Sequence, residues 1–239
     1  MKAIILAAGY GTRLKEIAKD LPKALLKLGN KTILDRLMEN LKKTDIKNIV
    51  IVTNNKFYQN FNDWKNKNNL NITIVNDGTN TNEERLGALG DLRLAIKTLN
   101  IKEDVLVLGS DNILNFEIKD MLDEFRKEKS IMVALAKLNN KEELKKMGVV
   151  SINKKKDIIL FEEKPLEPKS NYASTAVYIY PKEKLNLIEA YLKGKNNPEG
   201  PGNLLQYYYN KERIHCFISK EPWFDVGSIE VYDKVKNGI

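Results

Sequence analysis

The sequence predicts an α/β fold in which a mainly parallel central sheet is covered by helices on both faces. Apolar, strand-like runs alternate with amphipathic helical stretches through the first half of the chain, which is the order of elements that builds parallel sheets. These runs are almost continuously apolar, as in strands that are buried on both faces. Polar or glycine-rich clusters follow several of them. Because open α/β sheets bind ligands at the carboxyl ends of their strands, we expect these clusters to meet at one rim.

The first half supplies four expected strands and the helices that follow them. The strands are expected at 2–7, 48–53, 71–75 and 104–112, and the helices at 32–44, 56–67, 86–99 and 116–128. The helix at 32–44 shows the reason most clearly, because its apolar residues recur at helical spacing along one stripe. They are Ile33, Leu34, Leu37, Met38 and Leu41.

The pattern becomes more mixed after the apolar run at 131–138. Further strands are expected at 148–153, 157–165, 172–180, 213–218 and 223–227, and helices near 183–193, 203–210 and 228–236. The composition of 194–203, "GKNNPEGPGN", indicates a loop. No linker separates the two halves, so we expect one domain over residues 1–239. In this domain the second half extends the sheet and adds a small accessory lobe.

Composition indicates a globular chain of 239 residues, of which 42% are hydrophobic and 30% charged. No stretch approaches the ~18–20 apolar residues that span a bilayer. The short apolar run at the N-terminus continues into an arginine-bearing glycine turn rather than a cleavage site, so we expect a cytoplasmic protein. The net charge is +8, but lysines alternate with glutamates along helical stretches. That pattern favours solvated helix faces over a nucleic-acid surface.

The chain has one cysteine, Cys216, and one histidine, His215. This scarcity excludes a disulfide framework, a multi-cysteine zinc site and an HExxH site, and it makes a histidine-based triad improbable. The two residues are neighbours in a strand, so their side chains point to opposite faces and pack as ordinary strand residues. Carboxylates, lysines and arginines must therefore carry any catalysis.

Residues 7–14, "AAGYGTRL", follow the apolar run directly. Paired glycines pack nothing, so Gly9 and Gly11 indicate that a ligand approaches the main chain closely. The guanidinium of Arg13 suits a phosphate or a carboxylate. A nicotinamide fingerprint fails because Leu14 occupies the third glycine position and Thr53-Asn54 offers no acid after the second strand. The loop also lacks the GK[ST] of a Walker motif.

Six short stretches, in this order, resemble the sugar-phosphate nucleotidylyltransferases. They are "LAAGYGTRL", "LPKALL", "LGSDN", "EEKP", "NYASTAVYIY" and "WFDVGS". The segment "EEKPLEPKSNYAST" is most similar to the glucose-1-phosphate thymidylyltransferase branch. The resemblance runs from residue 2 to about 236. It implies a Rossmann-like three-layer α/β/α sandwich, with a nucleotide-binding half at 1–112 and a sugar-phosphate-binding half and accessory lobe at 113–239.

The implied reaction joins a nucleoside triphosphate, dTTP or UTP, to a sugar 1-phosphate and releases pyrophosphate. The resemblance assigns the glycine loop to the triphosphate, which its N–H groups would wrap. Arg13 would neutralise the leaving pyrophosphate, and Lys23 in "DLPKALL" would lie on the α-phosphate. A surface lysine in a turn is the alternative for Lys23. The loop residues are Ala8, Gly9, Gly11 and Thr12.

The resemblance also implies a Mg²⁺ ion. Asp111 in "LGSDN" and Asp225 in "WFDVGS" would bind it, because magnesium takes oxygen ligands, commonly one or two carboxylates together with phosphates. A side-chain cap for the following helix is the alternative role of Asp111.

A third group of residues is implied on the sugar side. Glu163 and Lys164 would clamp the sugar and its phosphate, although an ion pair at a strand end is the alternative. Tyr172 and Thr175 would line the sugar, with the Thr175 hydroxyl on its phosphate, and Asn112 would join them.

The nucleobase would lie against Leu86 and Gly87, where a flat ring needs close approach to the backbone. This stretch departs from the thymidylyltransferase pattern, because it lacks the usual glutamine and adds Asn80, Asn82 and Arg85. The identity of the base is therefore left open, as are the sugar and the pathway.

The implied reaction needs no histidine. A sugar 1-phosphate has a second pKa near ~6, so its attacking oxygen is already mostly ionised at neutral pH. The remaining obstacle is to hold two polyanions in line, and cationic groups with a metal ion do this.

Three alternatives remain. The chain could transfer a cytidylyl group to phosphocholine or another non-sugar phosphate, or it could be a non-catalytic regulatory subunit that keeps the fold. Nucleic-acid binding is supported by net charge alone. We expect small-molecule partners, no nucleic acid and no membrane, and the oligomeric state, including a homo-oligomer, is left open.

Overall fold

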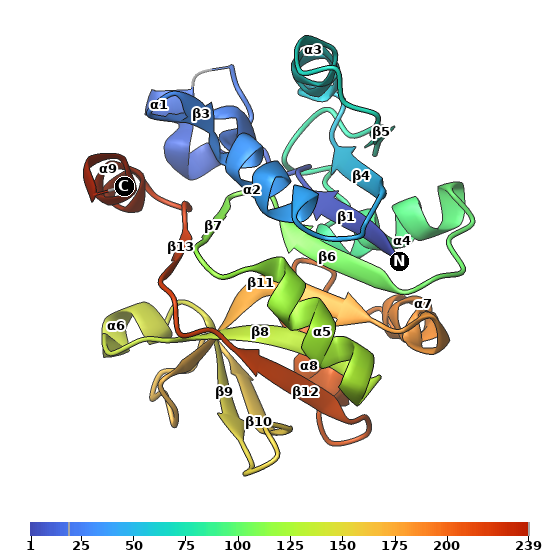
Figure 1. Ribbon diagram of the computed structural model, residues 1–239, viewed down its shortest axis with the longest axis vertical. Coiled ribbons are helices and arrows are strands. Elements are labelled where there is room, and N and C mark those ends of the chain that lie inside the picture. The colour runs from blue at the N-terminus through green and yellow to red at the C-terminus, as the bar shows by residue number, and fades with distance from the viewer. Residues whose placement is uncertain (19, 239) are drawn as a thin grey trace.

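The computed structural model describes residues 1–18 and 20–238, which form one α/β unit (Figure 1). Within these ranges the main sheet has nine strands, and its principal order is β10-β9-β11-β6-β1-β4-β5. β8 pairs with β11 and β12 pairs with β8. The strands are β1 (Lys2–Leu6), β4 (Asn48–Thr53), β5 (Thr73–Asn76), β6 (Val105–Gly109), β8 (Ile131–Lys137), β9 (Gly148–Ile152), β10 (Ile158–Glu163), β11 (Tyr172–Tyr180) and β12 (Ile214–Ile218).

The sheet is mixed, as the sequence predicts. β1 is parallel to β4 and β6, and β4 is parallel to β5. β12 runs parallel to β8. Antiparallel pairing enters with β11, which lies between β6 and β8 and is antiparallel to both. The parallel strands of the first half all direct their carboxyl ends to one edge.

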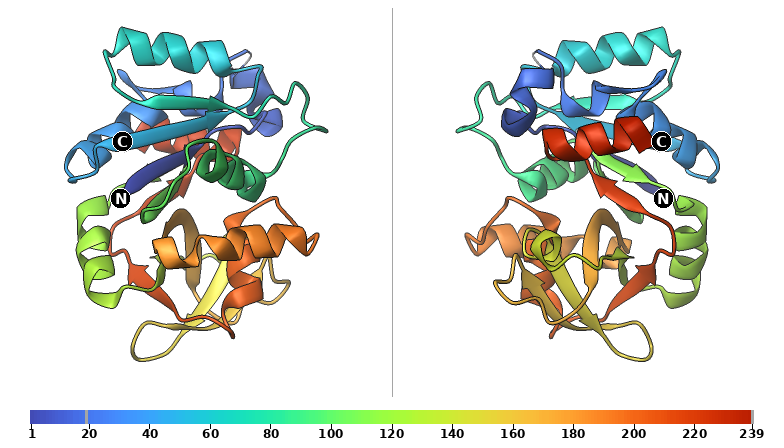
Figure 2. Two further views of the ribbon diagram at one scale, coloured as in Figure 1. Left: turned by 90° about the vertical axis from the view of Figure 1, so that its right-hand side faces the viewer. Right: turned by 90° about the vertical axis from the view of Figure 1, so that its left-hand side faces the viewer.

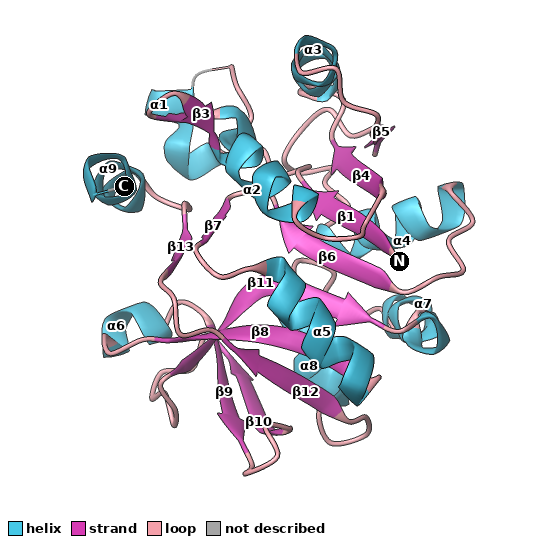
Figure 3. Cartoon of the chain, viewed as in Figure 1, coloured by secondary structure: helices cyan, strands magenta, loops and turns pink. Residues whose placement is uncertain are grey.

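Helices cover both faces of this sheet and enclose two apolar cores (Figure 3). On one face, the core includes residues of α2 (Ile33–Lys42), α3 (Tyr58–Lys67) and α5 (Ile118–Glu128). On the other, it includes residues of α4 (Ala88–Thr98), α7 (Asn186–Lys193) and α8 (Pro201–Tyr208). The result is the expected three-layer sandwich.

The start of α2 shows how local sequence sets these boundaries. The hydroxyl of Thr32 accepts a hydrogen bond from the Asp35 backbone N–H at 3.0 Å, and the Asp35 carboxylate accepts one from the Thr32 backbone N–H at 2.8 Å. This reciprocal capping box satisfies two N–H groups that the first helical turn leaves free. The buried stripe that follows is the one read from the sequence.

Several short elements escape sequence analysis. They are the hairpin of β2 (Lys27–Leu28) and β3 (Lys31–Thr32), the strand β7 (Asn112–Leu114), and the helices α1 (Lys15–Ala18) and α6 (Lys141–Leu144). The strand β13 (Trp223–Asp225) lies within the strand expected at 223–227, but its pairing with β7 was not expected. The last helix is α9 (Ile229–Gly238). α8 begins at residue 201, inside the stretch expected to be a loop, because Pro201 stands at the first turn, where its fixed φ favours a helix start. No helix in the described ranges has the length and apolar character needed to cross a membrane.

Candidate active site

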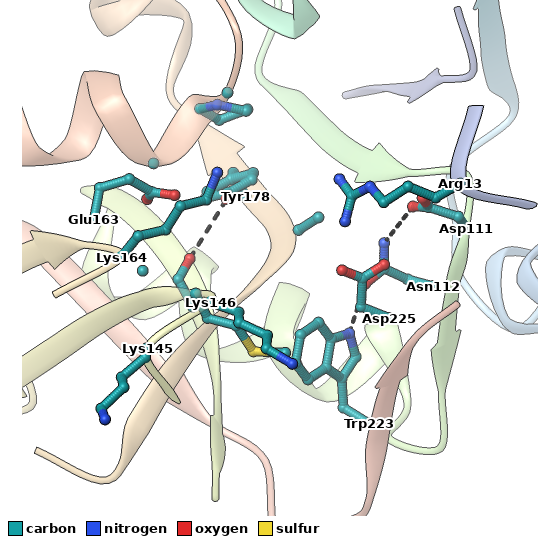
Figure 4. A pocket seen from close by; sticks show the side chains of 17 residues that line it. Arg13, Asp111, Asn112, Lys145, Lys146, Glu163, Lys164, Tyr178, Trp223 and Asp225 are labelled. Atoms are coloured by element: carbon teal, nitrogen blue, oxygen red, sulfur yellow. Dashed lines mark hydrogen bonds between the residues drawn. The ribbon is translucent and has the colours of Figure 1, made fainter. Parts of the chain in front are cut away.

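A cavity of about 520 Å³ opens at the carboxyl ends of β1 and β6 and extends towards β9, β10 and β11 (Figure 4). In the close-up, Arg13, Asp111 and Asp225 lie on one wall, and Glu163, Lys164 and Tyr178 lie on the other. The cavity therefore joins residues from the two halves of the chain. Its lining is Arg13, Asp111, Asn112, Lys145, Lys146, Met147, Gly148, Glu163, Lys164, Ser174, Ala176, Tyr178, Gly200, Pro201, Gly202, Trp223 and Asp225.

The short β7–β13 pair brings the two predicted metal ligands together. Asp225 in β13 lies opposite Asn112 in β7, and the Val226 N–H donates to the Asp111 carbonyl at 2.9 Å. The indole N–H of Trp223 donates to Asn112 Oδ1 at 2.6 Å, and Asn112 Nδ2 donates to Asp111 Oδ1 at 3.1 Å. Asn112, predicted to bind the sugar phosphate, thus uses its amide to fix Asp111 in place.

Electrostatics at this wall favour a bound cation. Burial and the adjacent Asp111 charge raise the pKa of Asp225 to about 7, against the attraction of Lys23 and Arg13. Two carboxylates that repel one another are a natural cation site. In the described ranges no group of three or more Asp, Glu, His or Cys residues could hold a metal ion. A metal bound by these two acids must complete its shell with other oxygens, which is the habit of magnesium.

Lys23 reaches this wall from the start of a short 3-10 helix, Lys23–Leu25, that precedes β2. Its ammonium lies 3.5 Å from Asp111 Oδ2, and its side chain is only 18% exposed. The glycine loop packs directly on it: at Gly11, with φ of +65°, an added Cβ would lie 3.3 Å from Lys23 Cγ. The positive φ and the close contact together explain a glycine at this position.

The rest of the predicted phosphate loop borders the same rim. The carbonyl of buried Ala8 accepts a hydrogen bond from Asn54 Nδ2 at 2.8 Å, which ties the loop to the end of β4. Gly9 has no heavy atom within 4 Å of an added Cβ, so its surroundings are open. Thr12 and Arg13 are exposed. Arg13 lines the cavity, whereas Ala8, Gly9, Gly11 and Thr12 are not among the lining residues.

Glu163 lies at the far wall in a space that two glycines leave open. An added Cβ would lie 3.0 Å from Glu163 Oε2 at Gly148 and 2.5 Å from it at Gly202. Burial raises the pKa of this carboxyl, against the attraction of Lys164. Lys164 adopts a positive φ of +50° and donates its backbone N–H to the Met147 carbonyl at 2.9 Å. The predicted sugar clamp therefore lines the cavity.

The prediction for Thr175 is wrong. Its side chain is 0% exposed, and its hydroxyl donates to the Ala134 carbonyl at 2.9 Å, inside the sheet. Strand alternation instead directs Ser174, Ala176 and Tyr178 to the cavity. Tyr172, at the start of β11, is half-buried against the core of the α4 face and is not among the lining residues.

Sequence reasoning missed most of the far wall. Tyr178 lines the cavity, and its hydroxyl lies 3.4 Å from that of Ser174. Residues 145–148 and 200–202 also line it. Period-two alternation in β11 could have identified Ser174 and Tyr178, but no local signal marks residues 145–148 and 200–202.

The predicted base-contact residues lie outside this cavity. Gly87 is buried at the start of α4 with φ of +76°, and an added Cβ would meet the Pro198 carbonyl oxygen at 2.6 Å. Leu86 beside it is half-buried. Nearby, burial and the Asp77 carboxylate raise the pKa of Asp91 to about 8. Asp91 is 5% exposed, and its Oδ1 and Asp77 Oδ2 are buried without a hydrogen-bond partner among the described residues.

The lone histidine and cysteine play no part in the cavity. Cys216 is fully buried in the core. The imidazole of His215 lies 3.0 Å from carboxylate oxygens of both Asp157 and Glu124. The groups that line the cavity and can take part in chemistry are thus carboxylates, lysine and arginine cations, hydroxyls and the amide of Asn112.

Comparison with known proteins gives the following likenesses. A family model described as nucleotidyl transferase matches residues 2–239. A Bacillus anthracis protein described as a glucose-1-phosphate thymidylyltransferase, crystallised with sucrose, superposes with a TM-score of 0.84 at 26% identity, over 99% of this chain and 94% of that one. A UDP-glucose pyrophosphorylase complexed with UDP-glucose superposes with a TM-score of 0.82 at 24% identity, over 99% and 97%. At 24% identity, the likeness to the UDP-glucose pyrophosphorylase shows a shared fold only.

Proposed function

Because the chain belongs to the nucleotidyl transferase family, we propose that it joins a nucleoside triphosphate to a sugar 1-phosphate and releases pyrophosphate. One observation carries the proposal. Arg13, Asp111 and Asp225 come from distant parts of the sequence and line the same cavity. Lys23, paired with Asp111 at 3.5 Å, adds a cation beside it. Such a concentration of basic groups and paired acids suits a triphosphate bound through a metal ion.

The basic residues provide the charge neutralisation that the reaction needs. Arg13 holds the β- and γ-phosphates and stabilises the negative charge that grows on the leaving pyrophosphate. Lys23 stabilises the α-phosphate under attack. The acceptor oxygen is already ionised, so no residue has to remove a proton. Binding the two anions in line is the main contribution of the protein.

Asp111 and Asp225 fit a Mg²⁺ ion, since both offer carboxylate oxygens and the Asp111 charge contributes to the raised pKa of Asp225. When bound, the ion supplies Lewis-acid stabilisation of phosphate charge. Trp223 and Asn112 orient Asp111 through their two hydrogen bonds.

The far wall is the proposed acceptor site. Lys164 binds the phosphate of the acceptor, and Glu163 accepts hydrogen bonds from its hydroxyl groups. The Tyr178 hydroxyl takes the place that the sequence assigned to Thr175, because it lies on the cavity face of β11. Leu86 and Gly87 receive the nucleobase.

The substrate pair is proposed from likeness. The described activity of the Bacillus anthracis protein supports dTTP, with UTP as the other pyrimidine nucleotide, and a hexose 1-phosphate such as glucose 1-phosphate.

A pyrophosphate-release screen tests the function. Purified chain with Mg²⁺ is combined with each of ATP, CTP, GTP, UTP and dTTP against a panel of sugar 1-phosphates and phosphocholine. We expect turnover with a pyrimidine nucleotide and a sugar 1-phosphate. Turnover with CTP and phosphocholine alone would contradict the acceptor class, and pyrophosphate release with no pair would contradict the function.

A further inference from the structure

One segment outside the proposed catalytic residues contacts both halves of the site. Residues 197–202 comprise the end of the connection from α7 to α8 and the first two residues of α8, and all of them lie in the stretch expected to be a loop. In the left view of Figure 2, the orange chain between these helices rises towards the start of α4. We call residues 197–202 the bridge segment.

At its first end, the bridge segment is joined to the loop that precedes α4. The Leu89 N–H donates to the Pro198 carbonyl at 2.9 Å. Gly87 packs on the same carbonyl so closely that a Cβ would lie 2.6 Å from its oxygen. Arg85 Nε lies 3.0 Å from Glu199 Oε2, and Arg85 Nη1 donates to the Asn82 carbonyl at 2.7 Å. A movement of the loop before α4, the proposed base-binding loop, would therefore displace this end of the bridge segment.

At its other end, the bridge segment forms part of the acceptor wall. Gly200, Pro201 and Gly202 line the cavity. Gly202 packs against the Glu163 carboxylate, since a Cβ there would lie 2.5 Å from Oε2. The Asn203 N–H donates to the Gly200 carbonyl at 3.0 Å, which starts α8 directly behind this wall. Gly202 lies only three residues after Glu199. A shift of Glu199 would thus reach the Glu163 carboxylate, which faces the proposed acceptor site.

We propose that the bridge segment couples the two substrate sites, with Arg85 and Glu199 as the positioning pair that sets its register. When Arg85 holds Glu199, Gly202 keeps Glu163 and the acceptor wall in the binding arrangement. The inference rests on the proposed function, because it presumes a nucleotide at the loop before α4 and an acceptor at Glu163. Neither Arg85 nor Glu199 lines the cavity, so both act through other residues.

A charge-swap experiment tests the coupling. The variants are Arg85→Glu, Glu199→Arg and the double variant R85E/E199R. Each is assayed with the nucleotide and acceptor that the wild-type chain turns over fastest in the pyrophosphate-release screen. Each single variant places like charges together, so we expect it to raise the KM for the acceptor about three- to tenfold. The double variant restores the ion pair and should return that KM to near the wild-type value.

The KM for the nucleotide separates coupling from general damage. Arg85→Glu adds an acid to the loop before α4, so its effect on the nucleotide KM should persist in the double variant, while the acceptor KM recovers. A matched control is the pair Lys97–Glu189, which joins α4 to α7 at 2.9 Å away from the bridge segment. K97E and E189K should leave the acceptor KM unchanged.

Two results overturn the proposal in different ways. If the wild-type chain is active and Glu199→Arg leaves the acceptor KM unchanged, or if the double variant combines both defects, the coupling is wrong and the function stands. If the wild-type chain turns over no pair in the screen, the proposed function fails and takes the coupling with it. Melting temperatures of all variants identify any loss that comes from unfolding.

Discussion

The Lys23 ammonium lies 3.5 Å from the Asp111 carboxylate, although Lys23 follows α1 and Asp111 follows β6, far apart in the sequence. The Lys23 side chain is mostly buried, with its stem against Gly11. Burial of a lysine beside an acid requires compensation of both charges. In the proposed function, a triphosphate with its cation would supply the anion for Lys23 and the cation for Asp111 at once.

Replacement of Lys23 by Gln should slow turnover by about 10²- to 10³-fold, because it removes a cation from charge that develops at the α-phosphate. The fold should persist. Lys27→Gln, on the exposed edge of β2, is the matched control and should keep near wild-type kinetics. Steady-state pyrophosphate release with circular dichroism melting measures both effects. A fully active K23Q protein would remove Lys23 from the mechanism.

Variants on the two faces of β11 should affect different properties, one acceptor binding and the other the stability of the fold. Tyr178→Phe removes a hydroxyl from the cavity face and should raise the acceptor KM with little change in melting temperature. Thr175→Val removes the hydrogen bond to the buried Ala134 carbonyl and should cost about 1–2 kcal/mol of unfolding free energy with an unchanged KM. Urea unfolding and acceptor titration measure the pair. The reverse outcome would return Thr175 to the acceptor site.

Gly202→Ala should weaken acceptor binding selectively. The added methyl would meet Glu163 Oε2 at 2.5 Å and force the carboxylate away from its present position. Gly200→Ala should have a smaller effect, because no heavy atom there lies closer than 3.9 Å. The acceptor KM of both variants, at saturating nucleotide, provides the measurement. Equal increases in the acceptor KM of both variants would show that Gly202 does not act by leaving room for the Glu163 carboxylate.

Asp91 predicts a pH dependence of stability. Burial first, and then the Asp77 carboxylate and Glu199, raise its pKa from 3.8 to about 8. Between these values the folded chain keeps the proton that the unfolded chain releases, so stability should fall as the pH rises through this window. Asp91→Asn cannot ionise and should flatten this part of the profile, gaining most at its alkaline end.

The matched control for Asp91 is Asp120→Asn, which removes an exposed acid from the first turn of α5. Its effect on unfolding free energy should be small and should not change the slope of the profile. Urea unfolding between pH 4 and pH 8 gives the comparison, with the limits set by the two pKa values of Asp91. An unchanged slope in D91N would place the origin of the pH dependence elsewhere.

Most strands of the main sheet could be predicted because they lie in nearly continuous apolar runs, as β1 and β6 do. β13 lies in the strand expected at 223–227, but its pairing with β7 could not be predicted, since β7 has only three residues and the two strands are far apart in the sequence. That pair brings Asp225 to Asp111. Sequence analysis reached both acids through the order of motifs rather than through any local structural signal.

Thr175 and Pro201 show two other limits. The motif around Thr175 suggested a substrate contact, but strand alternation decides which side chains face the cavity, and it selects Ser174 and Tyr178. The composition of 194–203 indicated a loop, which is correct for its first part. Its contact with Glu163 depends on how α8 packs behind β10, and no local pattern encodes that packing.

The most direct measurement is pyrophosphate release by Asp111→Asn and Asp225→Asn with Mg²⁺ as the sole metal. If these acids and the basic groups beside them form one triphosphate site, each variant should remain folded and lose activity by orders of magnitude. Near wild-type rates in both would show that the cavity does not hold the metal and triphosphate, and would contradict the proposed function at its centre.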